Sequence, residues 1–360
     1  MIHVGEAIRN KRKQLRLTQG EVAGDYMSDS KLSNIENGKI LPDPQVWAYL
    51  REKLGLSEEL THQKQHAEKV GFLLDQAETY ETAGLKEKSE AKYREAAELA
   101  SKSVLLDQAG RAYQKLGSLY TGMKKYKQAL DCLDKALAFL ERTDHWELAV
   151  TCELKYAVVF YLEEKYVASL EHAKRALERI PDDEEKMRGA VHYDIACAYY
   201  RLHMIDRANF ECEQALSHLT KDNGDYYIAA LILQGILFKK GKMYLLAKKK
   251  HREAKDLAFR RGKSHYLGLC WHNLGDVSME TGNFEESLEC FRLALEVKEQ
   301  SGDKIGIVRT KTYMAELFYR MGDNRSALEM AHESLELSRQ HHLKTDEFFS
   351  VRTLSKIYAA

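Results

Sequence analysis

The chain has only 3 Pro among its 360 residues, so very little in it interrupts a helix. No apolar run approaches the roughly 18 residues needed to cross a bilayer, and the longest candidate, at 156–162, is followed directly by three charged residues. The first residues lack the apolar segment of a signal peptide, and the six Cys are dispersed singly. These absences predict a helical, cytoplasmic protein that has no membrane partner.

Motifs for catalysis and metal binding are also missing. The triplet Gly262-Lys263-Ser264 lacks the first glycine of a phosphate-binding loop, because position 257 is Leu. No paired-Cys, HExxH or GxSxG pattern occurs. We therefore expect that the chain is not an enzyme and that it has no cofactor and no metal.

The first sixty residues carry start and stop signals for four short helices. The signals are a capping box of Thr18 with Glu21, the N-caps Ser28 and Asp43 (followed by Pro44), and the stops Gly38 and Gly55. The side chains expected to point inward are Val4, Ile8, Leu15, Val22, Ala23, Leu32, Ile35, Trp47, Leu50 and Leu54. Short helices joined by tight turns are typical of a helix-turn-helix domain.

The residues Thr18-Gln19, Leu32-Ser33 and Ile35–Gly38 resemble the Cro/repressor-like (Xre-type) helix-turn-helix family over about residues 4–56. The resemblance implies a double-stranded DNA operator as partner. It places Asp29, Ser30 and Asn34 at base edges with Lys31 nearby, and Gln19, Arg9, Arg12 and Lys39 at phosphates. A protein-binding role for this module is the alternative. Residues 1–41 hold seven Lys or Arg and five Asp or Glu, so one copy should bind DNA weakly and a homodimer is expected.

A period of about forty residues runs through the rest of the chain. The small residue of each repeat lies 40, 40, 39, 39, 40 and 40 residues after the previous one. These anchors are Ala77, Gly117, Ala157, Ala196, Gly235, Gly275 and Ala315, and an aromatic residue follows three positions later in all but the sixth repeat. The turn residues expected between the two helices of a repeat are Gly84, Gly122, Gly241, Gly282 and Gly322.

Segments 115–137 and 273–295 resemble the tetratricopeptide repeat, a pair of antiparallel helices. The resemblance implies a right-handed superhelix with a concave inner wall. The predicted fold is therefore all-α. We assign 1–60 to the helix-turn-helix domain, 61–66 to a linker and 67–360 to seven repeats plus a capping helix.

The combination of the two modules is similar to the peptide-pheromone-responsive regulators of the Rap, NprR, PlcR and Rgg group. That resemblance implies a homodimeric transcription regulator whose DNA binding is controlled by a short signalling peptide in the concave groove, as in quorum sensing. Two alternatives stay open. The chain could be a Rap-like adaptor that binds a response regulator, or a DNA-binding protein whose repeats recruit another protein without a peptide.

The tetratricopeptide resemblance also indicates which side chains line the inner wall. They are Tyr193, Asp194, Tyr200, Arg201, Lys239, Lys240, His272, Asn273, Asp276, Tyr313, Glu316, Tyr319 and Arg320. An Asn side chain can pair with both polar groups of a peptide backbone, and the family's groove asparagine maps onto Asn273. The alternative is that this set is only the solvated inside of a curved array. The basic run Lys248–Lys250 with Arg252 is expected to be a solvated face rather than a second nucleic-acid contact.

Overall fold

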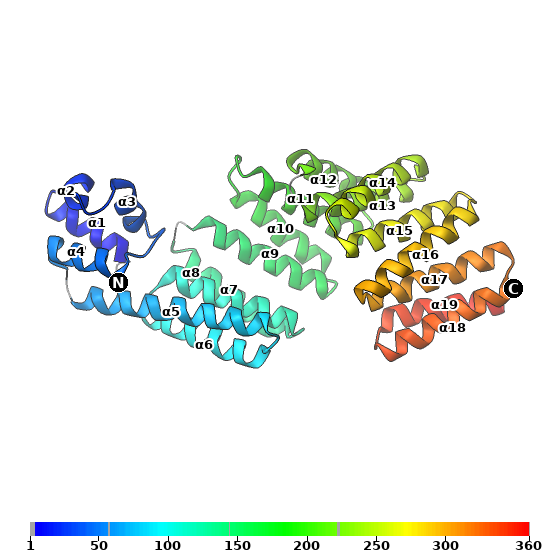
Figure 1. The fold of residues 1–360 in the computed structure, drawn as a ribbon, viewed down its shortest axis with the longest axis horizontal. Helices are drawn as coiled ribbons and strands as arrows, with labels where there is room; N and C mark the ends of the chain where they lie inside the picture. Colours follow the sequence, from blue (N-terminus) through cyan, green and yellow to red (C-terminus); the bar gives the residue numbers. More distant parts are fainter. Residues whose placement is uncertain (1–3, 57, 144, 222–223, 360) are drawn as a thin grey trace. The chain divides into compact units, whose positions relative to one another are not determined.

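The computed structural model describes residues 4–56, 58–143, 145–221 and 224–359, with side chains throughout except at 58–62. These residues form α-helices and no β-strand, which confirms the predicted all-α fold (Figure 1). The chain divides into two compact units, 1–180 and 181–360.

The first unit contains ten helices within its described residues. They are α1 (Val4–Gln14), α2 (Gln19–Ala23), α3 (Asp29–Glu36), α4 (Pro44–Leu54), α5 (Glu58–Thr82), α6 (Lys86–Lys102), α7 (Leu106–Gly122), α8 (Tyr126–Leu140), α9 (Trp146–Leu162) and α10 (Tyr166–Arg179).

The second unit contains nine helices within its described residues. They are α11 (Glu185–Arg201), α12 (Ile205–His218), α13 (Asp225–Lys240), α14 (Tyr244–Arg260), α15 (Ser264–Glu280), α16 (Phe284–Ser301), α17 (Lys304–Met321), α18 (Asn324–Gln340) and α19 (Lys344–Tyr358).

The N-caps predicted for α2, α3 and α4 are present. The Thr18 hydroxyl accepts a hydrogen bond from the Glu21 backbone N–H at 3.1 Å, and the Glu21 carboxylate accepts one from the Thr18 N–H at 2.7 Å. Ser28 and Asp43 cap α3 and α4 in the same manner. All but one of the side chains expected inside are buried around Ile8, and the exception is Leu15.

Leu15 is 45% exposed, so its predicted burial is wrong. Helix α1 ends at Gln14, and Arg16 adopts a left-handed conformation with φ +57°. The chain therefore leaves the helix before Leu15 reaches the apolar stripe that Val4 and Ile8 begin.

Helix α5 runs without interruption through residues 61–66, which the sequence analysis assigned to a linker. No Gly or Pro occurs between Glu58 and Val70, so nothing in this segment ends a helix. Lys64 is buried, and its ammonium lies 5.6 Å from the centre of the Trp47 ring on α4. The helix-turn-helix domain is thus joined to the first repeat by a helix that packs against it.

Helices α5–α18 form seven consecutive antiparallel pairs, and α19 packs against α18 and α17 (Figure 1). In each pair a left-handed residue lies seven positions after the anchor, at Gly84, Lys124, Glu164, His203, Lys242, Gly282 and Gly322. The N–H of the next residue donates to the carbonyl three positions after the anchor, at 2.8–3.0 Å. This bond ends every first helix in the same way.

Two of the predicted turn glycines do not take the left-handed position. Gly122 is the last residue of α7, and Gly241 has φ −78°. Lys124 and Lys242 adopt the left-handed conformation instead. Glycine is therefore less tightly linked to this turn than the sequence suggested.

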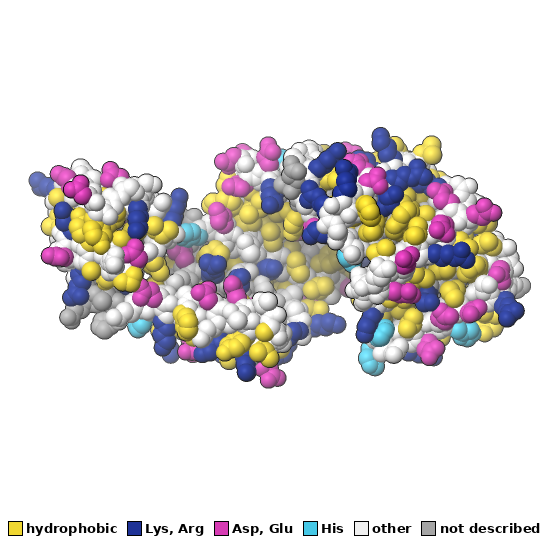
Figure 2. Space-filling model, viewed as in Figure 1, with side chains coloured by type: hydrophobic (Ala, Val, Ile, Leu, Met, Phe, Trp, Pro, Cys, Tyr) yellow, Lys and Arg dark blue, Asp and Glu magenta, His cyan; other side chains and the backbone are white. Residues whose placement is uncertain are grey.

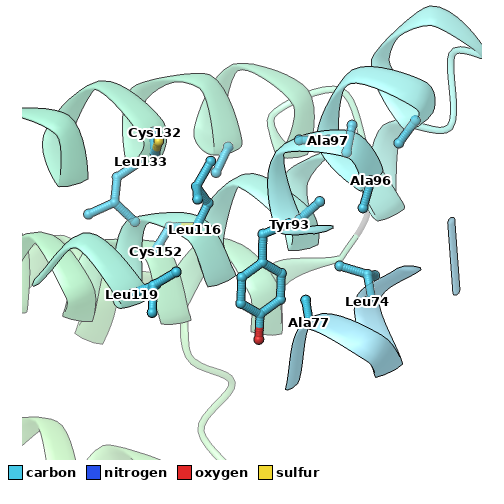
Figure 3. Close-up of a cluster of buried hydrophobic side chains, with 14 of the residues drawn as sticks. Leu74, Ala77, Tyr93, Ala96, Ala97, Leu116, Leu119, Cys132, Leu133 and Cys152 are labelled. Atoms are coloured by element: carbon cyan, nitrogen blue, oxygen red, sulfur yellow. The ribbon is translucent and has the colours of Figure 1, made fainter. Parts of the chain in front are cut away.

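The anchors allow the two helices of a repeat to approach closely. A Cβ atom added to Gly235 would lie 2.4 Å from the His251 ring, and one added to Gly275 would lie 2.8 Å from the Phe291 ring. In the first repeats Tyr93 fills the space beside Leu74 and Ala77, and its hydroxyl donates to Glu81 at 2.8 Å (Figure 3). The repeating core thus follows from small residues placed opposite large ones.

Candidate functional site

Helix α3 presents a polar face next to α2. Asp29 and Ser30 are exposed at its start, and Asn34 is half-buried one turn further along. The ammonium of Lys31 lies 3.1 Å from the Asp43 carboxylate at the start of α4. Asp, Ser and Asn side chains that are exposed or half-buried on one short, capped helix can form the hydrogen bonds that read base edges.

A buried carboxylate holds α1, α2 and α3 together. The Glu36 side chain is fully buried, and it accepts hydrogen bonds from Arg12 at 2.6 and 2.9 Å and from Gln19 at 2.9 Å. Burial opposes the ionisation of Glu36, but these hydrogen bonds and the nearby Arg12 and Arg9 charges win, so its pKa is lowered. No sequence motif indicates this cluster, because 24 residues separate Arg12 from Glu36.

The phosphate contacts predicted for this region stay predictions. Arg12 and Gln19 direct their side chains to Glu36. Arg9 also faces Glu36, at 3.8 Å, and donates to the Asn37 side chain. Lys39 is exposed beyond the end of α3. A phosphate at Arg12 or Gln19 would compete with the bonds that position α3.

The predicted inner-wall residues lie on the first helices of four repeats in the second unit. Neighbouring helices of the set α11, α13, α15 and α17 contact one another, so they form one layer. Lys239 on α13 forms an ion pair with the buried Asp276 on α15. Burial, only partly offset by Lys239, raises the pKa of Asp276. Residues 37 positions apart are thus brought together at the centre of the layer.

Two tyrosines adjoin this ion pair. Burial raises the pKa of Tyr200 on α11, and the charges of Lys239 and Asp276 both act on its hydroxyl. Burial also raises the pKa of Tyr313 on α17, and Asp276 and Tyr200 add to that shift. Tyr200, Lys239, Asp276 and Tyr313, one from each helix of the layer, are called the central cluster below.

Asn273 and His272 lie beside the central cluster on α15, and both are buried. The Asn273 side-chain nitrogen has no hydrogen-bond partner among the described residues and is covered from solvent. His272 Nδ1 lies 3.1 Å from the Thr310 hydroxyl, and its ring packs edge-to-face on Tyr313 with centres 4.7 Å apart. Burial, with nearby Lys298, keeps the pKa of His272 well below its usual value, so the ring is neutral.

The remaining predicted residues lie in two other places. Arg320 contacts Glu280 at 3.1 Å and Glu316 at 3.0 Å, and Glu316 also accepts from Lys356 on α19. The Lys356 ammonium lies 4.9 Å from the centre of the Tyr319 ring. The others on α11 and α13 are half-buried Tyr193, which packs edge-to-face on Tyr226, half-buried Asp194, exposed Arg201 and exposed Lys240.

Sequence reasoning missed two polar groups beside this layer. Lys298 on α16 is buried and donates to the Thr310 hydroxyl at 2.8 Å. His251 on α14 is buried against Gly235, and its Nδ1 has no partner among the described residues. Both lie on second helices, which the repeat pattern assigns to the outside, so no sequence signal marked them.

Family comparisons agree with the two-module architecture. Residues 3–63 match a helix-turn-helix domain model, and residues 108–182 and 267–340 match a tetratricopeptide repeat model. The chain therefore contains a helix-turn-helix domain and tetratricopeptide repeats. Both matched families are regulatory or binding domains. No curated protein matches the sequence.

Three solved structures show where this fold occurs. The apo form of RapI matches with a TM-score of 0.63 and 16% identity, over 76% of this chain and 99% of RapI. The apo quorum sensor NprR from Bacillus thuringiensis matches with a TM-score of 0.56 and 16% identity, over 79% of this chain and 80% of NprR. The Rap conjugation regulator of plasmid pLS20, in complex with the Phr* peptide, matches with 0.50 and 19%, over 76% of each chain. The predicted resemblance is confirmed at the level of the fold.

No helix among the described residues is long and apolar enough to cross a membrane. No group of three or more His, Cys, Asp or Glu side chains in the described part of the chain could hold a metal ion.

Proposed function

We propose that this helix-turn-helix protein is a cytoplasmic, homodimeric transcription regulator whose DNA affinity is set by a short peptide. Helix α3 reads the operator through Ser30 and Asn34, and Asp29 favours a cytosine amine over a phosphate. The exposure of Asp29 and Ser30, the partial exposure of Asn34 and the capped start of α3 support this role. The near-neutral charge of residues 1–41 supports a dimer, because two weak modules on one duplex bind more tightly than one.

The peptide site is the layer of α11, α13, α15 and α17, centred on Asn273. The observation that carries this assignment is the unpaired Asn273 nitrogen, since leaving a buried donor without a partner costs about 1–3 kcal/mol. A peptide carbonyl would satisfy that donor. The Lys239–Asp276 pair would hold polar or charged groups of the peptide, and Tyr200 and Tyr313 would cover its apolar side chains.

The Asn273 nitrogen is covered, so a peptide reaches it only after neighbouring side chains move. Peptide binding is therefore coupled to a rearrangement of the first-helix layer. A ligand that binds two arrangements unequally shifts their populations, and this is how the peptide would alter the dimer and its DNA affinity. The helix α5, which packs on both modules, connects the repeats to the reading domain.

Two selections with the purified full-length chain test this function. A random duplex library yields the preferred operator, and a random heptapeptide library yields a ligand. Asn34→Ala should weaken operator binding at least about tenfold, because one side-chain pair to a base contributes about 1–3 kcal/mol. Asn273→Ala should weaken peptide binding and leave operator binding intact. Unchanged peptide affinity in Asn273→Ala would show that the peptide binds elsewhere.

A further inference from the structure

Positive charge is concentrated in one short segment of the second unit. Residues 239–263 contain eleven Lys or Arg but only one Glu and one Asp, which leaves a net charge of +9. The whole chain has a net charge of 0, so all the other residues together carry −9. The run Lys248–Lys250 with Arg252 holds fewer than half of these cations. The expectation of a merely solvated face therefore needs to be reconsidered.

The structure places many of these cations on the outward side of α14 and on the turn before it. Lys249, Arg252 and Arg260 are exposed on α14 at spacings that keep them on one side of the helix, and Lys242 is exposed in the turn. Figure 2 shows Lys and Arg side chains gathered over this helix. From Lys242 to Arg260 the face spans roughly 27 Å at 1.5 Å per residue, which equals about eight base-pair steps of a duplex.

Five other cations of the segment are already engaged, and one of them, Arg261, donates to the Lys221 carbonyl. Lys239, Lys248 and Lys263 pair with carboxylates of neighbouring helices, namely Asp276, Glu286 and Asp225. Lys255 pairs with Asp256. Within the described residues, no ion pair joins Lys242, Lys249 or Arg260 to a carboxylate, and Arg252 approaches Glu286 only at 3.5 Å. Of the rest, Lys240 ends α13 and Lys250 is half-buried. Four exposed cations on α14 and the turn before it are thus left to face a partner, and we call them the basic face: Lys242, Lys249, Arg252 and Arg260.

We propose that the basic face binds the phosphate backbone of double-stranded DNA without reading its sequence. Lys and Arg that neutralise phosphates supply most of the non-specific affinity for DNA, and the helix-turn-helix domain has few of them. Lys is depleted in protein–protein interfaces, so a face rich in Lys favours nucleic acid over a protein partner. This goes beyond the proposed function, which assigns DNA to α3 alone.

Two exposed apolar side chains on the same helix favour the competing explanation. Leu245 is 86% exposed and Phe259 is 72% exposed, and such residues are typical of protein interfaces. Leu245 lies between Lys242 and Lys249 along the chain, and Phe259 directly precedes Arg260. A protein partner or a second copy is therefore kept as an outcome of the test.

The test measures binding of the full-length chain to a fluorescein-labelled random-sequence duplex of 20 base pairs, by anisotropy between 50 and 200 mM salt. The test variant is K242Q/K249Q/R252Q/R260Q. The control, K127Q/R175Q/R179Q/R292Q, removes four exposed cations from other helices and changes the net charge equally. All eight residues are exposed, so both variants should fold, and circular dichroism checks this.

We expect the slope of log affinity against log salt to fall by about 3.6 in the test variant, since each of the four lost phosphate contacts removes roughly 0.9. Affinity at 100 mM salt should fall at least about tenfold, and the control should match the wild type. The inference is overturned if the slope is unchanged or if the control loses as much DNA affinity as the test variant. It is also overturned if the substitutions leave DNA binding unchanged and alter only the mass of the protein in analytical ultracentrifugation, since the face would then bind a second copy. The variant S30A/N34A separates the two proposals: if it still prefers the selected operator, α3 is not the reader, whereas the basic face is unaffected.

Discussion

Arg12 holds Glu36 through two charge-assisted hydrogen bonds, from Nε to Oε1 at 2.6 Å and from Nη2 to Oε2 at 2.9 Å. The pair joins α1 to α3, and Gln19 on α2 adds a third hydrogen bond to the same carboxylate. One buried charge therefore sets the relative position of the three helices that any DNA reading depends on. Removing one partner would leave the other buried and unpaired, which is costly.

Glu36→Gln should reduce the stability of the helix-turn-helix domain at pH 7 by about 3 kcal/mol, because it removes the carboxylate from a buried ion pair. Hydrogen–deuterium exchange of the α1 and α3 amides measures this loss locally. Glu6→Gln, at an exposed position of α1, is the control and should change little. Unchanged exchange in Glu36→Gln would mean that the pair does not hold the helices.

The difference between wild type and Glu36→Gln should depend on pH in one direction. The pKa of Glu36 is lowered in the folded chain, so the unfolded chain takes up its proton first as the pH falls. The stabilisation is fully present above the ordinary Glu pKa and is lost as the pH falls through the lowered value. The two proteins should therefore approach equal stability only below about pH 4.

The left-handed turn position makes opposite predictions at two repeats. Glu164→Gly should raise the free energy of unfolding by about 0.5–1 kcal/mol, because a side chain is strained at φ +61°. Gly282→Ala introduces that strain at φ +78° and should lower the free energy of unfolding by about 1 kcal/mol. Thermal unfolding followed by circular dichroism measures both. Changes of the same sign would contradict the assignment of this position.

Lys298 should make the second unit more stable as the pH rises. Burial lowers its pKa to about 8; Asp303 partly opposes this shift, and Arg309 adds to it. Below pH 8 both states carry the proton and the cost of burying the charge is present. Between about pH 8 and pH 10.5 the folded chain has released the Lys298 proton while the unfolded chain still holds it, so stability rises with pH.

Urea unfolding at pH 7 and pH 9.5 tests this, followed at Trp271, the only one of the three tryptophans that lies in residues 181–360. We expect a gain on the order of 2 kcal/mol in the wild type. Lys298→Met fills the same space without a charge and should show a much smaller gain in stability between the two pH values. A gain of equal size in both proteins would assign the pH dependence to other groups.

Features that depend on residues close together in the sequence could be predicted. The caps Thr18, Ser28 and Asp43 were predictable because each acts on a backbone N–H three residues away. The forty-residue period was readable because each repeat must place a small anchor opposite a large side chain. Local rules also have limits. Leu15 was misplaced because α1 stops one residue earlier than the apolar pattern suggests.

Contacts between distant residues were not predictable. No sequence pattern near Arg12 predicts its pairing with Glu36, and none near Lys239 predicts its pairing with Asp276. The left-handed conformation at Lys124 and Glu164 follows from the closing bond of the turn, which overrides the usual preference for Gly. The candidate site was therefore predictable as a layer of helices, but its internal pairing was not.

The most direct test of the central claim measures operator affinity with and without peptide. The full-length chain is titrated onto its selected operator by fluorescence anisotropy, with the selected peptide absent or saturating. The account predicts that the peptide changes the Kd at least fivefold in the wild type, and that Asn273→Ala removes this change while keeping the peptide-free Kd. Equal Kd values with and without saturating peptide in the wild type would contradict it.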